Sequence, residues 1–347
     1  MATDVNQADI QPGIQVAEDL KGRRAWLITD GKAGSTRQAE GIATALGLAA
    51  TVKHANPTAL YRILAPFGPV DPAARFGAED GDFGPPWPDV AIAVGRRSAP
   101  YLRALRKVAP GRCFSVYLMD PRAGRNVADM IWVPAHDRLR GANVFTTPTA
   151  PHPFTPERLA ALRGTMADDI VALPQPRVAI LIGGRSAAYP FSAKETAAFA
   201  SALQSLVALG ASFMITPSRR THAELLAATL AATHGTPRLV IDATSGPNRY
   251  PEFLAHAEAF VVTADSINMT GEAAATGRPV YVFHPSGGRS KFRRFHENLE
   301  AHGATRPLPE TLSQFISWHY EPIDSTGDIA REIFRRWSAW RETIVAV

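Results

Sequence analysis

The sequence contains a single cysteine among its 347 residues, which excludes a disulfide within the chain. Cys113 lies in the apolar stretch CFSVYLM (113–119), where a small core residue is expected and a catalytic thiol is the alternative. No uninterrupted apolar run approaches the roughly 18 residues that a membrane-spanning helix needs. A disulfide scaffold and an integral membrane protein are therefore not expected.

Targeting signals are also missing from the first residues. Residues 1–22 are polar and partly acidic, with neither the apolar core of a signal peptide nor the arginine-rich character of a transit peptide. We expect a flexible tail on a cytoplasmic protein that is able to make peripheral contact with the inner face of the membrane. The length and the apolar content of 46% allow two globular domains.

Lysine is scarce, because only six of the 37 basic residues are lysines, although the net charge is +5. The planar fork of arginine suits phosphates and diphosphates as well as nucleic acid. The arginines are dispersed in pairs such as Arg96-Arg97 and Arg219-Arg220, and no helix carries a massed basic face. We therefore predict no nucleic-acid partner.

Short apolar runs alternate with helical segments, as expected for parallel strands joined by helical crossovers. Strands are predicted at 23–30, 89–95, 113–120, 129–137 and 143–147 in the first half, and at 177–184, 211–218, 238–243, 259–266 and 279–283 in the second. The fold class is therefore α/β, with two Rossmann-like sheets.

The domain organisation follows from these two series of strands. We predict a tail over 1–22, an N-terminal domain over 23–155, a linker over 156–176, a C-terminal domain over 177–325 and a final amphipathic helix over 326–347 that packs back on the first domain. The Pro- and Gly-rich segment 66–89 is predicted to be a mobile surface loop. Its aromatic residues are candidates for membrane or acceptor contact: Phe67, Phe83 and Trp87.

Ligands of doubly wound sheets bind where strands end and helices begin. The loop LITDGKAGSTRQ places acidic, basic and small residues after the first strand: Asp30, Gly31, Lys32, Gly34 and Ser35. It matches neither the Walker A loop nor the G-x-G-x-x-G fingerprint, so NAD is disfavoured. A helix N-terminus beside glycines favours an anion, and a plain glycine-rich connector is the alternative.

Two loops of the second half repeat this pattern. AILIGGRSAAYPF ends a strand with Gly183, Gly184, Arg185 and Ser186, which suits a diphosphate. MITPSRRT ends the next strand with Thr216, Ser218, Arg219 and Arg220. Its arginines are either anion ligands or part of a solvated edge.

A third loop opens the helix of TADSINMTGEAAATG. Asp265 or Ser266 is expected to cap this helix, whose N-terminus then favours an anion. Glu272, in the second turn, can accept hydrogen bonds from the two hydroxyls of a ribose. A glutamate on a solvent-facing helix is the structural alternative.

Further polar residues follow strands of the first half. His136-Asp137 and Asp120 end two strands, and His136 or Asp30 is the candidate general base for an acceptor hydroxyl. Arg96, Asp120 and Asp137 join the loop after the first strand as candidate substrate contacts. The histidines have no zinc-protease spacing and no cysteine cluster exists, so no metal site is predicted.

The order of motifs resembles the mitochondrial-fission Elm-type family. The matching blocks are LITDGKAGSTRQAEGIATALGL, AVGRRSAPYLRAL, VPAHDRLRGANVFTT, LIGGRSAAYPF, ITPSRRT, TADSINMTGEAAATGRPVYVF and KFRRFHENLEAHGATRPL. They span about 23–308. The arginine- and alanine-rich composition indicates a bacterial member, so the organelle-fission adaptor role of the plant member is not transferred.

The second half is also similar to the donor domain of GT-B glycosyltransferases, including the peptidoglycan N-acetylglucosaminyltransferase. That resemblance implies two Rossmann-like domains facing a cleft, with Gly183, Gly184, Ser266 and Glu272 on a nucleotide sugar. The first half departs from that enzyme, because DGKAGS lacks the histidine of its Gly-rich acceptor loop.

These observations predict a hexosyltransferase-type enzyme. It would transfer a sugar from a nucleotide diphosphate donor to a lipid or envelope acceptor, without a metal and without a further cofactor. A catalytically silent GT-B-like scaffold is the alternative. A nucleotide-sugar epimerase needs a dinucleotide fingerprint and a Tyr-x-x-x-Lys pair, and neither is present.

Overall fold

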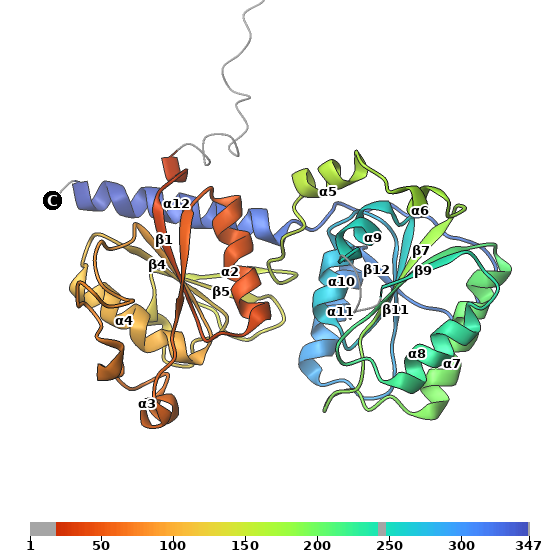
Figure 1. Cartoon of the computed structure of the whole chain (residues 1–347), viewed down its shortest axis with the longest axis horizontal. Coiled ribbons are helices and arrows are strands. Elements are labelled where there is room, and N and C mark those ends of the chain that lie inside the picture. The colour runs from red at the N-terminus through yellow and green to blue at the C-terminus, as the bar shows by residue number, and fades with distance from the viewer. Residues whose placement is uncertain (1–18, 242–247, 346–347) are drawn as a thin grey trace, which may run out of the picture. The chain divides into compact units, whose positions relative to one another are not determined.

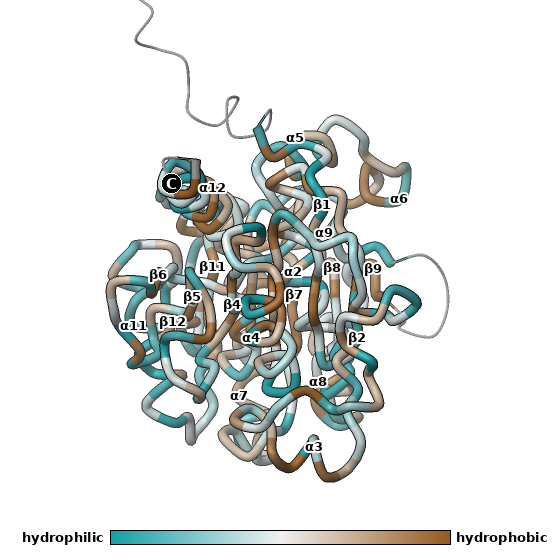
Figure 2. Tube along the Cα trace, turned by 90° about the vertical axis from the view of Figure 1, so that its left-hand side faces the viewer, coloured by the Kyte–Doolittle hydropathy of each residue, from teal (hydrophilic) through white to brown (hydrophobic). Residues whose placement is uncertain are grey.

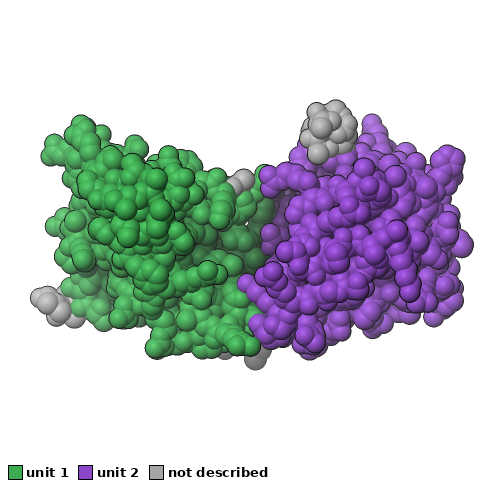
Figure 3. All heavy atoms as spheres, turned by 90° about the horizontal axis from the view of Figure 1, so that it is seen from below, with its two compact units in different colours: residues 1–153, 325–347 green, residues 154–324 purple. Residues whose placement is uncertain are grey.

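A computed structural model describes residues 19–241 and 248–345 (Figure 1). The chain divides into two compact units, coloured separately in Figure 3. Unit 1 consists of the chain up to Pro153 together with the segment from Ser325 onward, and unit 2 is Phe154–Asp324. Unit 1 is thus discontinuous in sequence.

Unit 1 is built on one parallel six-stranded sheet with the order β2-β1-β3-β4-β5-β6. Its strands are β1 (Arg24–Thr29), β2 (Ala49–His54), β3 (Val90–Val94), β4 (Phe114–Leu118), β5 (Met130–Pro134) and β6 (Val144–Thr147). Its helices are α2 (Ala33–Ala45), α3 (Ala59–Leu64), α4 (Ala99–Val108) and α12 (Ser325–Val345).

The central strands of this sheet are buried on both faces, which explains their continuous apolar sequences. Leu27 and Ile92 face a core that includes α2 and α12, whereas Ile28 and Ala93 face the core under α4. Ile333 of α12 is fully buried in the first of these cores. The expectation that the C-terminal helix packs back on the first domain is confirmed.

Unit 2 repeats the architecture with the parallel order β12-β11-β10-β7-β8-β9. Its strands are β7 (Arg177–Ile182), β8 (Ser212–Pro217), β9 (Arg238–Val240), β10 (Ala259–Thr263), β11 (Val280–Phe283) and β12 (Thr305–Pro307). Its helices are α5 (Pro156–Arg163), α6 (Asp168–Val171), α7 (Ala193–Ala208), α8 (Ala223–Ala232), α9 (Tyr250–His256), α10 (Ile267–Ala274) and α11 (Ser290–Ala301). The two Rossmann-like sheets are therefore confirmed.

Each sheet has a topological switch point, where successive crossovers leave in opposite directions. In unit 1 it lies between β1 and β3, and in unit 2 between β7 and β10. The crevice beyond the carboxyl ends of two such strands is where open α/β sheets bind ligands.

The segment expected as a linker, 156–176, carries α5 and α6, and its Leu159 and Ile170 are buried in the core of unit 2. The expectation for the loop at 66–89 needs correction. Phe83 is 2% exposed and packs on Trp26 and Tyr101, so its ring is not available for an external contact. Trp87 packs on Trp26 and is partly buried.

Candidate functional site

A buried carboxylate organises the switch point of unit 2. Asp265 follows β10, and its Oδ2 accepts a hydrogen bond of 2.8 Å from the backbone N–H of Gly184, which follows β7. Its Oδ1 accepts one of 2.8 Å from Oγ1 of Thr263, and that hydroxyl accepts from the N–H of Gly183. Asp265 therefore ties the two switch-point strands together.

The two glycines of this turn are required by the protein's own packing. A Cβ on Gly183 would lie 2.3 Å from the carboxylate oxygens of Asp265, and a Cβ on Gly184 would lie 1.8 Å from the carbonyl oxygen of Arg220. Their N–H groups are already engaged. The predicted contact of this loop with a diphosphate therefore cannot use these two N–H groups while they are bonded to Thr263 and Asp265.

The charge of Asp265 is balanced on one side by Arg220, whose Nη2 lies 3.1 Å from Oδ2. Burial raises the pKa of Asp265, while the hydrogen bonds from Gly184 and Thr263 and the charge of Arg220 oppose that rise. Asp265 or Ser266 was the expected cap of α10, and Asp265 precedes the capping position. Ser266 occupies the N-cap position of α10, without a side-chain capping bond.

The remaining candidates of unit 2 surround this turn on neighbouring strands. Arg185 and Ser186 follow β7, and Ser218 and Arg219 follow β8, the next strand of the sheet. Ser218 accepts a hydrogen bond from the N–H of Arg220 and shapes the loop. The guanidinium groups of Arg185 and Arg219 belong to exposed residues. The structure thus brings the predicted donor-binding loops together at one edge.

Sequence reasoning missed His222 in this loop. Both of its ring nitrogens are shielded from solvent and have no hydrogen-bond partner among the described residues. Desolvation and the charge of Arg185 lower the pKa of His222, so the imidazole is neutral at pH 7. A histidine between a strand and a helix carries no motif, and only its surroundings identify it.

Glu272 lies in the second turn of α10, as expected, and Tyr250 of α9 orients it. The phenol of Tyr250 donates a hydrogen bond of 2.5 Å to Oε2 of Glu272. Burial and the negative charge of Glu272 raise the pKa of Tyr250, so the phenol keeps its proton. Because a carboxylate offers about four acceptor positions, this bond is compatible with a second donor such as a ribose hydroxyl.

In unit 1, Asp30 takes the corresponding place at the β1–β3 switch point. It packs against Gly95 after β3, where an added Cβ would lie 2.5 Å from Cγ of Asp30. The side chain is 5% exposed, and Oδ2 lies 3.4 Å from Nζ of the exposed Lys32. Oδ1 is buried without a hydrogen-bond partner in the described part of the chain.

The two switch-point aspartates therefore differ in how many groups stabilise their charge. Asp265 accepts hydrogen bonds from a backbone N–H and a hydroxyl and pairs with a guanidinium. Asp30 has an ion pair with Lys32, at 3.4 Å, on one of its two oxygens. Tyr117, which is close to Gly95, is not a candidate general base. Burial raises the pKa of Tyr117 to about 12, and its phenol donates to the carbonyl of Gly95.

The other candidates of unit 1 share the carboxyl edge of the sheet but spread along it. Arg96 follows β3 and donates to the carbonyl of Arg62; Asp120 follows β4 and accepts from the N–H of Arg122. His136, which is buried, and Asp137 follow β5. Since β1 and β5 are separated by two strands, Asp30 and His136 lie roughly 14 Å apart. They cannot act on the same proton directly.

The glycine-rich loop after β1 splits into two parts. Gly31 has a positive φ of 82° and ends the strand. Lys32 is the N-cap of α2, without a side-chain capping bond, and Gly34 and Ser35 lie in the first turn of that helix. The positive end of the α2 dipole therefore opens beside the carboxylate of Asp30.

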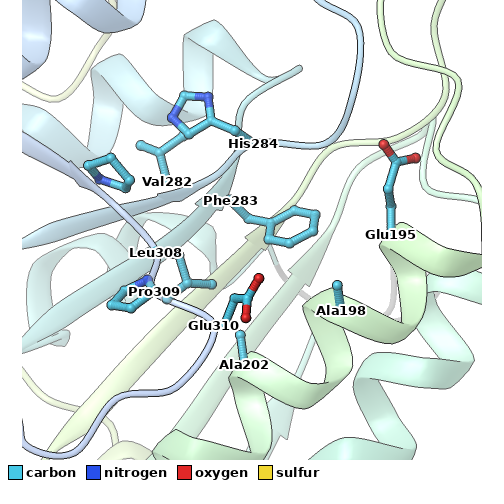
Figure 4. Close-up of a pocket in the computed structure, with 10 residues that line it drawn as sticks. Glu195, Ala198, Ala202, Val282, Phe283, His284, Leu308, Pro309 and Glu310 are labelled. Atoms are coloured by element: carbon cyan, nitrogen blue, oxygen red, sulfur yellow. The ribbon is translucent and has the colours of Figure 1, made fainter.

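A pocket of about 260 Å³ lies elsewhere on unit 2 (Figure 4). It is lined by Glu195, Ala198, Ala202, Val282, Phe283, His284, Pro307, Leu308, Pro309 and Glu310. Burial tends to raise the pKa of Glu195, but hydrogen bonds from Ser286 and Ser192 lower it to about 2. This carboxylate caps α7, and none of the residues predicted from the sequence lines the pocket.

The described residues form neither a metal site nor a membrane-spanning helix. No group of three or more His, Cys, Asp or Glu side chains is arranged to hold a metal ion. Across residues 19–241 and 248–345, no helix combines the length and apolar character needed to cross a bilayer.

The architecture defines a class of protein: two Rossmann-like units in a GT-B-like fold. UDP-GlcNAc 2-epimerase from Methanocaldococcus jannaschii has a similar fold, with a TM-score of 0.54 at 9% identity, over 91% of this chain and 99% of that one. The same enzyme in complex with UDP-GlcNAc and UDP gives a TM-score of 0.52 at 11% identity. A protein named as a nucleotide-sugar epimerase thus has a similar fold.

The chain belongs to the family described as mitochondrial fission ELM1, whose model matches residues 33–337. It is 28% identical to mitochondrial fission protein ELM1 of Arabidopsis thaliana over 275 residues, which are 73% of this chain and 64% of that protein. It is also 25% identical to the uncharacterized protein RP120 of Rickettsia prowazekii, over 89% of this chain and 97% of that one. The chain thus spans less than two thirds of the length of the plant relative.

Proposed function

We propose that unit 2 binds a nucleotide diphosphate sugar at the β7–β10 switch point and that the protein transfers the sugar to an acceptor hydroxyl. The observation that carries this proposal is the convergence of three neighbouring loops, after β8, β7 and β10, around one buried aspartate. These loops carry Arg185, Arg219 and Arg220, and Arg220 pairs with Asp265, which directly precedes the N-terminus of α10, where anions are stabilised.

Each side chain has a distinct task in this proposal. Asp265 positions the glycine turn and Arg220, and it does not touch the phosphates. Arg185, Arg219, Ser186, Ser218 and Ser266 are assigned to the diphosphate, together with the first N–H groups of α10. Glu272, held by Tyr250, accepts from the ribose hydroxyls.

The reaction requires a proton acceptor on the acceptor side, and we assign it to Asp30 in unit 1. Its carboxylate takes the proton of the acceptor hydroxyl while that oxygen forms a bond to the anomeric carbon. The bond from this carbon to the diphosphate oxygen breaks, and its electron pair leaves with the nucleotide diphosphate. Arginines and the dipole of α10 stabilise the departing charge, so metal is not required.

A thermal-shift panel tests the proposal. UDP, GDP, CMP, ADP, dTDP and their sugars are compared with and without magnesium, beginning with UDP-GlcNAc because a protein of similar fold binds it. At a concentration 100 times its Kd, a ligand adds roughly 2.7 kcal/mol of stability. A selective, magnesium-independent shift is expected for one nucleotide. The absence of any shift would contradict the proposal.

Replacing Glu272 by Gln should weaken binding of the selected nucleotide roughly tenfold, because a charged acceptor of two ribose hydroxyls becomes a neutral one. Tyr250→Phe should weaken it less, because the carboxylate stays but loses its orienting phenol. Isothermal titration calorimetry with the ribonucleotide and its 2′-deoxy analogue measures both effects. If wild type and Glu272→Gln showed the same ratio of affinities for the ribonucleotide and its 2′-deoxy analogue, the assignment of Glu272 to the ribose would be wrong.

Replacing Asp30 by Asn should lower kcat about a hundredfold, as expected when a general base is removed. The affinity for the donor should not change, because Asp30 is in the other unit. Product release is followed by quantifying free nucleotide diphosphate. His136→Asn serves as the comparison. A larger loss of kcat in that variant would assign the general base to His136, which follows β5.

A nucleotide-binding scaffold without turnover is the second candidate, favoured by the similarity to a plant protein named for mitochondrial fission. It predicts the same thermal shift and the same effect of Glu272→Gln. It differs in one respect: no nucleotide diphosphate is released with any acceptor, and Asp30→Asn has no consequence.

A further inference from the structure

Unit 1 carries an exposed apolar tip, which we define as Leu60, Ile63, Leu64 and Phe67. These side chains are 61%, 75%, 42% and 72% exposed, respectively. Single exposed apolar residues are common on protein surfaces, but a cluster of four within eight consecutive residues is not. α3, which supplies three of them, has no buried residue at all.

The apolar tip stands out from the rest of unit 1 at α3, which is brown in the hydropathy colouring (Figures 1 and 2). An arginine of α4 holds the end of the tip in place. Arg103 of α4 donates hydrogen bonds to the carbonyls of Pro66, Phe67 and Gly68. These carbonyls are therefore satisfied within the protein, which a segment needs before it can enter a medium poor in water.

The segments that carry and support the tip are basic, and the nearby carboxylate of Asp71, which accepts a hydrogen bond from the N–H of Thr58 just before α3, is buried. The segments 49–70 and 90–119 contain no aspartate or glutamate. They contain eight Lys and Arg residues, of which Arg62 lies on α3 and Arg103 donates hydrogen bonds to the segment that follows α3. Arg96 reaches α3 directly, through a hydrogen bond of 2.6 Å to the carbonyl of Arg62. A convex apolar surface framed by arginines complements an anionic lipid interface.

We propose that the apolar tip is a membrane-docking surface, which inserts Leu60, Ile63, Leu64 and Phe67 among the headgroups of an anionic bilayer while Arg62 contacts their phosphates. A protein partner is the less favoured occupant, because the tip projects outward and the segments 49–70 and 90–119 carry basic side chains but no acidic ones. Docking in this way is independent of the nucleotide site in unit 2.

The position of the tip connects it to the acceptor side of the reaction. α3 begins just after the carboxyl end of β2, at the same sheet edge as Asp30 and Arg96. An acceptor hydroxyl on a membrane lipid would thus be presented near the proposed base. This second step rests on the proposed function, whereas membrane docking does not.

Vesicle co-sedimentation tests the docking surface. Wild-type protein is mixed with vesicles of phosphatidylcholine alone and with vesicles of equimolar phosphatidylcholine and phosphatidylglycerol. Binding is expected only to the anionic vesicles. Ile63→Gln and Phe67→Gln should each weaken it roughly tenfold, and Arg62→Gln roughly fivefold.

Val171→Gln is the matched control, because Val171 is equally exposed, at 60%, on α6 of unit 2. It should bind vesicles like wild type, and circular dichroism should show that all variants unfold at the same temperature. Failure of wild type to bind anionic vesicles, or equal losses for Val171→Gln and the tip variants, would overturn the proposal. So would a concentration-dependent dimer that Ile63→Gln abolishes, since the tip would then be a protein interface. Unchanged thermal shifts with nucleotide would show that the donor site is unaffected in any case.

Discussion

Replacing Gly184 by Ala should destabilise unit 2 by about 4 kcal/mol and abolish nucleotide binding. The added Cβ would lie 1.8 Å from the carbonyl oxygen and 2.3 Å from the carbonyl carbon of Arg220. These are backbone atoms, so no side chain can rotate away, and the turn must shift. That shift breaks the bond from the Gly184 N–H to the buried Asp265, leaving a charged group poorly satisfied.

Gly34→Ala is the matched control for this substitution. Gly34 has no atom within 4 Å of the position of an added Cβ, and it lies in the first turn of α2. Alanine there should be neutral or stabilising by up to about 1 kcal/mol. Both changes are followed by thermal unfolding monitored by circular dichroism. Equal stabilities of the two variants would contradict this prediction, because the turn at Gly184 would then accommodate a Cβ.

Acidification should destabilise unit 1 through His152, by about 3 kcal/mol between pH 6.5 and pH 4. Burial lowers the pKa of His152 to about 4, and its own backbone opposes this only in part. In this pH range the His152 imidazole therefore binds a proton in the unfolded chain but not in the folded chain. The stability is fully present above pH 6.5 and is lost as the pH falls toward 4.

The tryptophans allow this loss to be measured in unit 1, because five of the six lie there and only Trp318 belongs to unit 2. Urea unfolding followed by tryptophan fluorescence at pH 7 and pH 4.5 gives the change in wild type. His152→Gln keeps a polar side chain without a titrating group and should remove most of the difference. The same pH dependence in both proteins would show that another group is responsible.

Much of the fold could be predicted because parallel strands buried on both faces have recognisable apolar sequences. β2 was missed for the complementary reason: AATVKH is an edge strand with no fully buried residue, so it carries no apolar run. β12 is only three residues long. The loop at 66–89 was misjudged because its prolines and glycines suggested mobility, whereas Phe83 anchors it in the core.

The candidate site could be located from the sequence but not explained. Polar loops at strand ends identified Gly183, Gly184, Asp265 and Glu272. The sequence could not show that the glycine N–H groups are bound internally or that Asp265 faces Gly184, because those contacts join residues about 80 positions apart. The contact between Glu272 and Tyr250 depends equally on tertiary packing, and so does the burial of the His222 nitrogens without a hydrogen-bond partner in the described part of the chain.

Hydrogen–deuterium exchange with and without UDP-GlcNAc, or the nucleotide sugar that the thermal-shift panel selects, tests the central claim most directly. The account predicts slower exchange at the β7, β8 and β10 loops, in peptides covering 183–186, 218–222 and 265–272. This protection should be lost in Glu272→Gln, while α8 and the unit 1 helix α12 exchange as before. Protection confined to unit 1, or none at saturating ligand, would contradict the donor site proposed at the β7–β10 switch point.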